Sequence, residues 1–187
     1  AKSPERKEPS MTDSYAPTEL PASVSIQVTE SCNLRCKMCY EWGEKGSYRE
    51  AKKKPASLDI DVLKRLVREL APARPMYDLF GGEPLMYPHL EELILAIKEA
   101  GSSVDTPTNG TLLAKHAQML VDTQFNSVRV SLDGPQEIND VQRGRSSYEK
   151  AITGIDSLFR EKQRKKSQVP IISIIYTVTA ANYQAIE

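Results

Sequence analysis

Five short apolar runs alternate with stretches of helical periodicity along the chain, and this alternation constrains the fold more than any other feature. A parallel pair of strands needs a long crossover connection, which is usually a helix. Successive right-handed crossovers would either curl the sheet into a barrel segment or leave it doubly wound. The sequence therefore predicts an α/β fold with a parallel sheet. The expected strands are 24–28, 76–80, 104–106, 127–132 and 170–178, and the expected helices are 58–70, 89–100, 112–121, 146–160 and one that opens at Asn182.

The first expected helix, 58–70, has clear local signals at both ends. Ser57 stands at the N-cap position, and the proline-containing segment 71–75 ends the helix. The preceding stretch, 41–57, is basic and contains glycine, so we expect it to be a mobile loop. Apolar residues at helical spacing form the expected buried face, namely Leu58, Val62, Leu66 and Leu70.

Length and charge narrow the classes of function. The 187 residues suffice for one domain with a sizeable core. Lysine plus arginine and aspartate plus glutamate number 25 each, so the charge indicates neither nucleic acid nor an anionic membrane as a partner. No apolar run approaches the length of a transmembrane helix. Segment 1–20 is polar and carries no visible signal peptide, so we expect a disordered lead followed by a core domain over 21–187.

Three cysteines stand close together after the first expected strand, and the chain has no others. Cys32, Cys36 and Cys39 form a C-x₃-C-x₂-C run, which can hold a metal centre and leave one coordination position open. A [4Fe–4S] cluster normally takes four cysteine ligands, so three would leave one iron free to bind a substrate or cofactor. Free thiols intended for a metal also favour a reducing compartment, the cytoplasm.

A zinc site and a disulfide framework are the two alternatives to an iron–sulfur site at this cysteine run. A structural zinc ion needs a fourth ligand, which His89 or His116 could supply. Both histidines lie far along the chain on expected helices, without the close pairing of a zinc finger. A disulfide framework fits poorly, because the number of cysteines is odd and the chain is not cysteine-rich. The cysteine run favours an iron–sulfur site, and a zinc site remains the alternative.

Turn-forming residues follow the second, third and fourth expected strands, at 81–84, 108–110 and 131–134. Each could be a simple turn. In parallel α/β folds, however, ligands bind at the carboxyl ends of the strands, where the cysteines also stand. Arg129, Ser131 and Asp133 share one side of the fourth strand, since side chains alternate. A barrel interior would need such polar residues to hold a ligand, although an ion pair of Arg129 with a nearby acid is an equal alternative.

In this order and at this spacing, the motifs resemble those of the radical S-adenosylmethionine (SAM) enzymes. Arg143-Gly144 after the fourth strand and the T-V-T-x-x-N segment at 177–182 are similar to the SPASM/twitch branch of that family. The resemblance covers nearly everything from Val24 to Glu187. The motifs that carry it are Cys32-x₃-Cys36-x₂-Cys39, Gly81-Gly82-Glu83-Pro84, Thr108-Asn109-Gly110 and Ser131-Leu132-Asp133-Gly134.

The resemblance implies a (β/α)₆-like partial TIM-type barrel, with about five of its six β/α units present. We therefore expect a core domain that is truncated at its C-terminal end and lacks any auxiliary-cluster region. The resemblance also implies that the three cysteines hold a [4Fe–4S] cluster whose free iron binds the amino and carboxylate groups of SAM. The cofactor-binding residues that it implies are Met38 beside the adenine, Gly81, Gly82 and Glu83 at the amine, Asn109, Ser131 at the ribose or carboxylate, Asp133, and Arg143 at the carboxylate.

The implied activity is reductive cleavage of SAM to a 5′-deoxyadenosyl radical, which abstracts hydrogen from a peptide or a small metabolite. An electron donor such as flavodoxin or ferredoxin is the implied protein partner. Asp78 and Arg129 are candidate substrate contacts, or else they pair with each other. The alternative functions are a non-catalytic fragment or homologue that keeps the fold as a SAM- or metal-binding module, and a zinc-binding protein.

Overall fold

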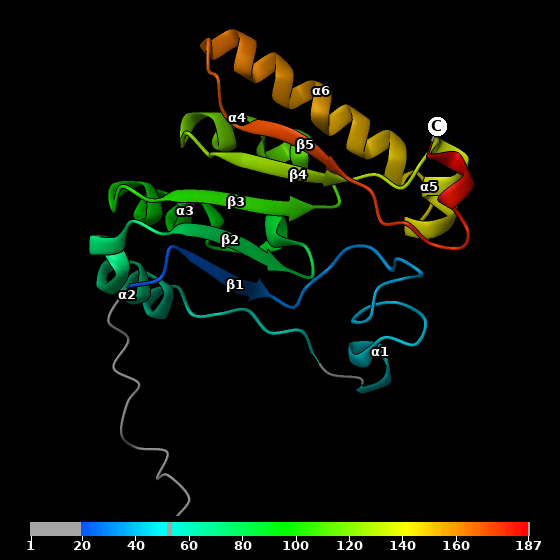
Figure 1. Ribbon diagram of the computed structural model, residues 1–187, viewed down its shortest axis with the longest axis horizontal. Coiled ribbons are helices and arrows are strands. Elements are labelled where there is room, and N and C mark those ends of the chain that lie inside the picture. Colours follow the sequence, from blue (N-terminus) through cyan, green and yellow to red (C-terminus); the bar gives the residue numbers. More distant parts are fainter. Residues whose placement is uncertain (1–19, 52–53, 187) are drawn as a thin grey trace, which may run out of the picture.

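The computed structural model describes residues 20–51 and 54–186, and it contains a single five-stranded sheet (Figure 1). All neighbouring strands pair in parallel, and their order in the sheet is their order in the chain. The predicted α/β class with a parallel sheet is therefore confirmed. The expected disordered lead falls almost entirely outside the described residues. The strands are β1 (Ser23–Thr29), β2 (Met76–Gly81), β3 (Ser103–Thr108), β4 (Ser127–Ser131) and β5 (Ile171–Ile175).

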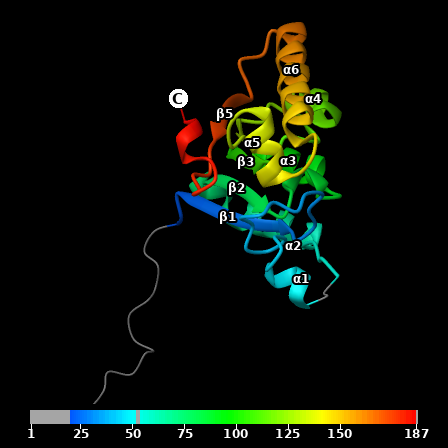
Figure 2. The same ribbon diagram turned by 90° about the vertical axis from the view of Figure 1, so that its right-hand side faces the viewer.

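Helices connect the strands and pack together on one face of the sheet (Figures 1 and 2). Sequential strand order with one covered face corresponds to a barrel segment, because a doubly wound sheet reverses its order and carries helices on both faces. In the described residues, no helix is long and apolar enough to cross a membrane. The helices are α1 (Ser47–Ala51), α2 (Ile60–Leu70), α3 (Leu90–Glu99), α4 (Leu113–Asp122), α5 (Gln136–Arg143) and α6 (Ser147–Lys165), with 3₁₀ turns at Ala71–Ala73, Pro84–Met86 and Tyr183–Ala185.

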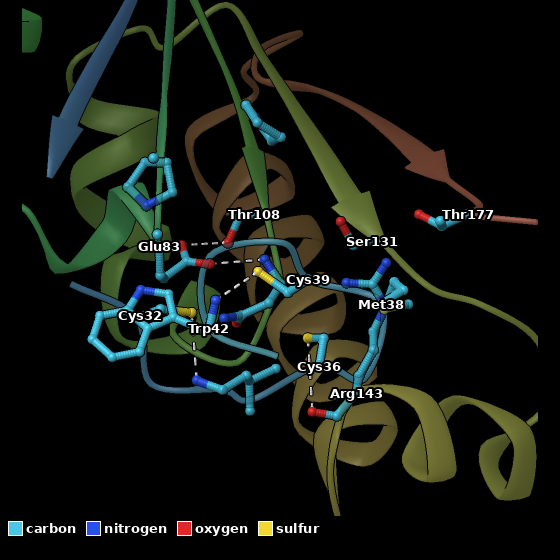
Figure 3. Close-up of a pocket in the computed structure, with 16 residues that line it drawn as sticks. Cys32, Cys36, Met38, Cys39, Trp42, Glu83, Thr108, Ser131, Arg143 and Thr177 are labelled. Carbon is cyan, nitrogen blue, oxygen red and sulfur yellow. Dashed lines mark hydrogen bonds between the residues drawn. The ribbon is translucent and has the colours of Figure 1, made fainter. Parts of the chain in front are cut away.

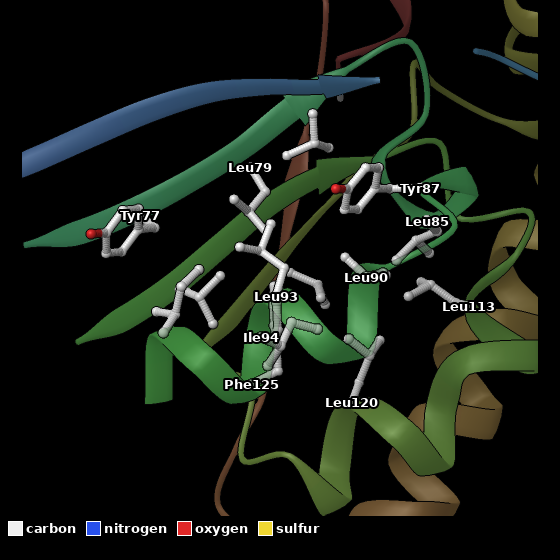
Figure 4. Close-up of a cluster of buried hydrophobic side chains, with 14 of the residues drawn as sticks. Tyr77, Leu79, Leu85, Tyr87, Leu90, Leu93, Ile94, Leu113, Leu120 and Phe125 are labelled. Atoms are coloured by element: carbon white, nitrogen blue, oxygen red, sulfur yellow. The ribbon is translucent and has the colours of Figure 1, made fainter. Parts of the chain in front are cut away.

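The core lies between the sheet and the helices (Figure 4). Tyr77 and Leu79 of β2 point to the same side and pack with Leu93 and Ile94 of α3, all of them fully buried. Alternation along each strand gives the sheet one apolar side toward the helices and one polar side away from them. The polar side carries Gln27, Asp78, Asp105, Arg129 and Ser131.

The start and the buried face of α2 differ from the prediction. Asp59, rather than Ser57, is the N-cap, and its carboxylate accepts from the N–H groups of Asp61 and Val62. Leu58 and Val62 are exposed, and the residues of α2 that are fully buried are Leu63 and Val67. Half of the predicted face is confirmed, because Leu66 packs against the core and Leu70 is half-buried, whereas the neighbouring stripe takes the place of Leu58 and Val62 in the core.

Other boundaries also differ from those predicted. β5 ends at Ile175 rather than at 178, and α6 continues to Lys165 rather than ending near 160. The sequence prediction missed α5, and only a 3₁₀ turn follows Asn182. The stretch 41–57 is not simply a loop, because it contains α1 and the buried side chain of Trp42.

All five strands point toward the same edge of the sheet, where the loops carrying the polar motifs converge (Figure 1). The segment that follows β1 bears the cysteines and is called the cysteine loop here, residues 32–46. Figure 1 shows this loop, α1, α5 and the 3₁₀ turn Tyr183–Ala185 together at that edge. The parallel topology therefore collects the motifs that the sequence spreads over 150 residues.

Candidate active site

One pocket of about 260 Å³ opens at this edge and is lined from all five strand-end segments (Figure 3). The three cysteine side chains point toward a common space, with Ser131 and Arg143 across from Cys32. The structure thus brings together ten of the residues singled out in the sequence. They are Cys32, Cys36, Cys39, Met38, Gly81, Gly82, Glu83, Asn109, Ser131 and Arg143.

Backbone N–H groups of the cysteine loop are directed at its sulfur atoms. Cys39 N donates to the carbonyl of Cys36 at 3.0 Å and closes a turn that holds both side chains on one side. Trp42 N donates to Cys39 Sγ at 3.3 Å, and Leu34 N donates to Cys32 Sγ at 3.5 Å. Hydrogen bonds to sulfur stabilise the thiolate over the thiol, which suits the loop to ligating a cation.

The cysteine loop is also anchored to α5. Lys37 N donates to the carbonyl of Gln142 at 2.8 Å. The thiol of Cys36 lies 3.8 Å from the carbonyl oxygen of Arg143, to which it donates. The C-terminal end of α5 therefore has two functions. It holds the cysteine loop, and it places Arg143 at the pocket wall.

Burial controls the protonation of the thiols in the absence of a cation. It raises the pKa of Cys32 to about 11, with the Glu83 carboxylate adding to the effect. Burial also raises the pKa of Cys36, while the neighbouring Arg143 guanidinium acts in the opposite direction. The three thiols form no disulfide with one another. A bound metal cation would reverse this balance, because it favours the thiolate directly.

The two histidines considered as zinc ligands lie away from the pocket. His89 stands at the N-cap of α3 beside Glu92, with Nδ1 and Oε2 3.6 Å apart, and His116 lies within α4. Among the described residues, no three His, Cys, Asp or Glu side chains converge closely enough to hold a single metal ion. The three cysteines line the pocket without a histidine beside them.

Glu83 is fully buried beneath the pocket, and protein donors occupy both of its carboxylate oxygens. Oε1 accepts from Thr108 Oγ1 at 2.8 Å and from Leu85 N at 3.1 Å, and Oε2 accepts from Asn109 N at 2.8 Å. Burial raises the pKa of Glu83, although these hydrogen bonds oppose the rise. The carboxylate therefore ties the turn after β2 to the turn after β3, a function that its sequence position did not reveal.

Asn109 continues this connection to the cysteine loop. Its Nδ2 donates to Asn33 Oδ1 at 2.8 Å, and Asn33 Nδ2 donates to Thr111 Oγ1 at 2.8 Å. Asn33 is next to Cys32 in the chain. The turns after β1, β2 and β3 thus form one hydrogen-bonded unit around the pocket.

The glycines after β2 lie against the backbone that follows β1. Gly82 N donates to the carbonyl of Thr29 at 2.9 Å, and Glu83 N donates to the carbonyl of Ser31 at 2.7 Å. A Cβ on Gly82 would stand 2.4 Å from Ser31 O and 2.6 Å from Glu30 O. Only glycine allows the two backbones to approach this closely at the pocket.

Replacing Gly82 with alanine is therefore expected to lower the free energy of unfolding by about 2 kcal/mol, because the clashing atoms belong to the backbone and cannot swing away. Urea denaturation measures the change. In the comparison variant Gly101→Ala, the added Cβ meets only the flexible Arg74 side chain at 3.4 Å, so its loss should come from the left-handed backbone at φ +73° alone, about 1 kcal/mol. Equal losses in the two variants would contradict the close-approach argument.

Arg143 reaches the pocket from α5 and is held by Asp133 behind it. Nη2 donates to Asp133 Oδ1 at 3.0 Å, and Nε lies 2.6 Å from Oδ2 at an angle that makes the contact an ion pair rather than an aligned hydrogen bond. Oδ1 also accepts from Thr177 N at 2.9 Å. Asp133 is fully buried and does not line the pocket. It contacts Arg143 and the backbone of Thr177 behind the pocket wall, and its predicted cofactor-binding role stays a prediction.

Asp78 and Arg129, the candidate substrate contacts, lie on the polar side of the sheet and outside the pocket lining. They form an ion pair, and Arg129 Nε also donates to Asp105 Oδ1 at 2.8 Å. Burial raises the pKa of Asp78, which Arg129 opposes and Asp105 reinforces. The ion-pair alternative is thus present in the structure, with a second acid that the sequence had not indicated.

Some lining residues were not assigned a site role from the sequence. Trp42 follows Cys39 by three positions, and Thr177 follows the end of β5, where it begins the T-V-T-x-x-N segment. The position of Thr177 at a strand's carboxyl end was the available signal. The signal for Trp42 was weaker, because an aromatic residue in a loop is not specific for a site. Leu34, Pro84, Pro107 and Thr108 complete the lining.

A family model described as "Radical SAM superfamily" matches residues 26–184. The Fe-coproporphyrin III synthase of Methanosarcina barkeri is 32% identical over 72% of this chain and 33% of its own length. The mycofactocin maturase MftC of Mycobacterium tuberculosis is 29% identical over 75% of this chain and 35% of its own length. The chain thus spans about a third of these curated relatives.

The fold also matches solved structures. The structure "Native anSMEcpe with bound AdoMet" superimposes with a TM-score of 0.69 at 22% identity, covering 88% of this chain and 48% of that one. The same protein has been solved with AdoMet and the Kp18Cys peptide, and that structure matches with a TM-score of 0.66. The two chains share a fold, in which the five parallel strands described here form part of the barrel.

Proposed function

The chain belongs to the radical SAM superfamily, and from this premise we propose that it holds a [4Fe–4S] cluster and SAM in the pocket and uses them to abstract hydrogen from a substrate. The observation that carries the proposal is the convergence on one pocket of three free cysteines, the glycine turn after β2, and Arg143. Family members of this kind combine an iron–sulfur cluster with SAM. The relatives above belong to the SPASM/twitch type.

The residues present fit both groups. Cys32, Cys36 and Cys39 offer three sulfur ligands on one pocket, the ligand type that iron–sulfur clusters take. The turn of Gly81 and Gly82 also lines the pocket, where the lack of a Cβ on Gly82 lets it lie against the backbone after β1, and Arg143 offers a guanidinium for a carboxylate. With both groups bound, one electron delivered through the cluster cleaves SAM to methionine and a 5′-deoxyadenosyl radical, which abstracts hydrogen from the substrate.

We assign the remaining roles to this chain's own residues. Gly81, Gly82 and the turn they form receive the methionine amine of SAM, and Arg143 receives its carboxylate. Glu83 holds that turn in place through its three donors and contributes negative charge beneath the amine. Ser131 contacts the ribose or carboxylate region from the end of β4, and Met38 lies beside the adenine. Their common placement in the pocket lining supports these roles.

Asn109 and Asp133 are assigned positioning roles. Asn109 joins the turn after β3 to Asn33 and so to the cysteine loop. Asp133 orients Arg143 and binds the backbone of Thr177, which lines the pocket after β5. Supports of this kind hold the charged groups in position before the reaction, so no free energy is spent on rearranging them during it.

For the substrate we propose a peptide, with a small metabolite as the second candidate. The peptide-bound structure of anSMEcpe favours this choice. On the polar side of the sheet, Arg129 lies level with the pocket residue Pro107 and two residues before Ser131, and Asp78 lies level with Asp105, where part of a substrate could reach them. Asp105 joins them there.

The test is anaerobic reconstitution of the full-length protein with iron and sulfide, followed by dithionite and SAM. We expect 5′-deoxyadenosine and methionine in equal amounts, quantified by liquid chromatography and mass spectrometry. Deuterated peptides should transfer deuterium into the 5′-deoxyadenosine, whereas labelled metabolites should not. A protein that binds iron but neither binds nor cleaves SAM would be the non-catalytic module. Zinc instead of iron in anaerobically purified protein would contradict the proposal.

A further inference from the structure

One buried polar side chain lies in the largely exposed segment that follows β5. Among the described residues after Ile175, only Asn182 is buried, and it is 1% exposed. Its neighbours Val178 and Tyr183 are more than half exposed. Burying an amide is costly unless both its donor and its acceptor groups find partners. The partners of Asn182 therefore indicate what its burial achieves.

The two ends of the Asn182 amide bind different parts of the protein. Oδ1 accepts from Thr179 N at 2.6 Å and closes the turn in which Asn182 itself stands. Nδ2 donates to the carbonyl of Thr177 at 2.9 Å and to the carbonyl of Asp133 at 3.1 Å. Because an N–H faces one end and two carbonyls face the other, the orientation of the amide is fixed. The turn uses only Oδ1, whereas Nδ2 reaches a residue 49 positions earlier, after β4.

Asp133 is held through its backbone as well as through its carboxylate. Its N–H donates at 2.9 Å to Oδ1 of Asn139, a fully buried residue of α5. Its carbonyl accepts from Asn182, and its Oδ1 accepts from Arg143 Nη2 and Thr177 N. Two buried asparagines from separate segments therefore fix the backbone of the residue that orients Arg143.

Asn182 does not line the pocket, but two residues that do line it depend on its contacts. Figure 3 shows Arg143 and Thr177 on the same side of the pocket as Ser131. The N–H of Thr177 donates to Asp133, and its carbonyl accepts from Asn182. Through these bonds, the position of Asn182 is passed on to the pocket wall.

We infer that Asn182 is a positioning residue for SAM, which acts by holding Asp133 and thereby sets the position of the Arg143 guanidinium. The inference rests on the proposed function, which assigns the carboxylate of SAM to Arg143. A guanidinium binds a carboxylate through N–H groups of fixed direction, so a small displacement of Arg143 weakens the contact. Recognition of the carboxylate therefore depends on Asn182, whereas recognition of the rest of SAM does not.

The test compares two ligands on the reconstituted full-length protein, namely SAM and decarboxylated SAM, by calorimetric titration. Decarboxylated SAM keeps the amine and the adenosine but has no carboxylate. We expect Asn182→Ala to weaken the binding of SAM about tenfold, the effect of losing one charge-assisted hydrogen bond. The affinity for decarboxylated SAM and the iron content should stay unchanged. Asn182→Ser, whose hydroxyl can still donate to one of the two carbonyls, should bind SAM with intermediate affinity.

A double variant shows whether Asn182 acts through Arg143. Arg143→Ala alone should weaken the binding of SAM, and adding Asn182→Ala should then change it by less than about twofold, because the group that Asn182 positions is already gone. The matched control is Asn126→Ala. Asn126 Oδ1 accepts from Lys98 Nζ at 2.9 Å and from Val104 N at 3.0 Å, just before β4 and thus at the opposite edge of the sheet. This control should leave the affinities for both ligands unchanged.

Three results would overturn the inference. They are an unchanged affinity for SAM in Asn182→Ala, an equal loss for both ligands in that variant, and a full further loss when Asn182→Ala is added to Arg143→Ala. If the unmodified protein binds no SAM, the proposed function fails, and urea denaturation of the same variants decides the inference. Asn182→Ala and Arg143→Ala should then destabilise the protein less together than the sum of their separate effects, because both act on Asp133. Additive losses would overturn it.

Discussion

Replacing any one of Cys32, Cys36 and Cys39 with alanine is expected to abolish stable iron binding and, with it, all cleavage of SAM. All three cysteines of these 187 residues line one pocket, so no other thiol of this domain stands ready to take over the lost position. The cluster already has one iron without a protein ligand, so after the substitution only two cysteine ligands would hold it. Anaerobic reconstitution followed by iron analysis and visible absorption spectroscopy measures the loss.

The control for the cysteine variants is Ser47→Ala, which removes an exposed polar group of similar size just after the cysteine loop. It should bind iron like the unmodified protein. Circular dichroism should show the same fold in all variants, because the cysteines are half-buried and stand outside the core. A single cysteine variant that keeps full iron content and normal absorption would contradict the ligand assignment.

Glu83→Ala is expected to lower the free energy of unfolding by about 3 kcal/mol or more, the larger of the two stability effects predicted here. The substitution leaves three buried donors, Thr108 Oγ1, Leu85 N and Asn109 N, without their acceptor. It also separates the turns after β2 and β3, so SAM affinity should fall as well. Urea denaturation and equilibrium binding of SAM measure the two effects.

Two further variants sharpen this prediction. Glu83→Gln keeps the size of the side chain but turns an amide NH₂ toward a backbone donor, so its stability should lie between those of the wild type and Glu83→Ala. In the control Glu92→Ala, an exposed carboxylate paired with Lys64 is removed, and the change should be much smaller. If Glu83→Ala were as stable as Glu92→Ala, the connecting role of Glu83 would be wrong.

The helix α2 shows how far local signals reach. Its existence and its C-terminal end follow from periodicity and from the prolines after it, and both were predicted. Its buried face was predicted in part, because Leu66 packs against the core but Leu63 and Val67 are fully buried in place of Leu58 and Val62. Its N-cap was predicted at Ser57, which was wrong. Asp59 caps, while Ser57 Oγ lies 2.8 Å from Thr29 Oγ1. That contact joins residues 28 positions apart, which a local pattern does not contain.

At the pocket, too, the sequence predicts which residue types are present but not which partners they contact. The cysteines and the polar turns stand at the ends of consecutive strands, so a parallel sheet had to bring them to one edge. The sequence did not indicate that Asp133 lies behind Arg143 or that both oxygens of Glu83 accept from protein donors. Nor did it indicate that Asp105 shares Arg129 with Asp78.

By itself, the sequence determined the family, the parallel α/β topology and the kinds of side chain at the pocket. Alternating strands and helices permit few topologies, and the handedness of the crossovers leaves fewer still. The tertiary structure alone decided which polar groups face the pocket and which support it from behind. Burial makes an unpartnered polar group costly, so each buried carboxylate takes the donors that packing brings within reach, and those donors come from distant parts of the chain.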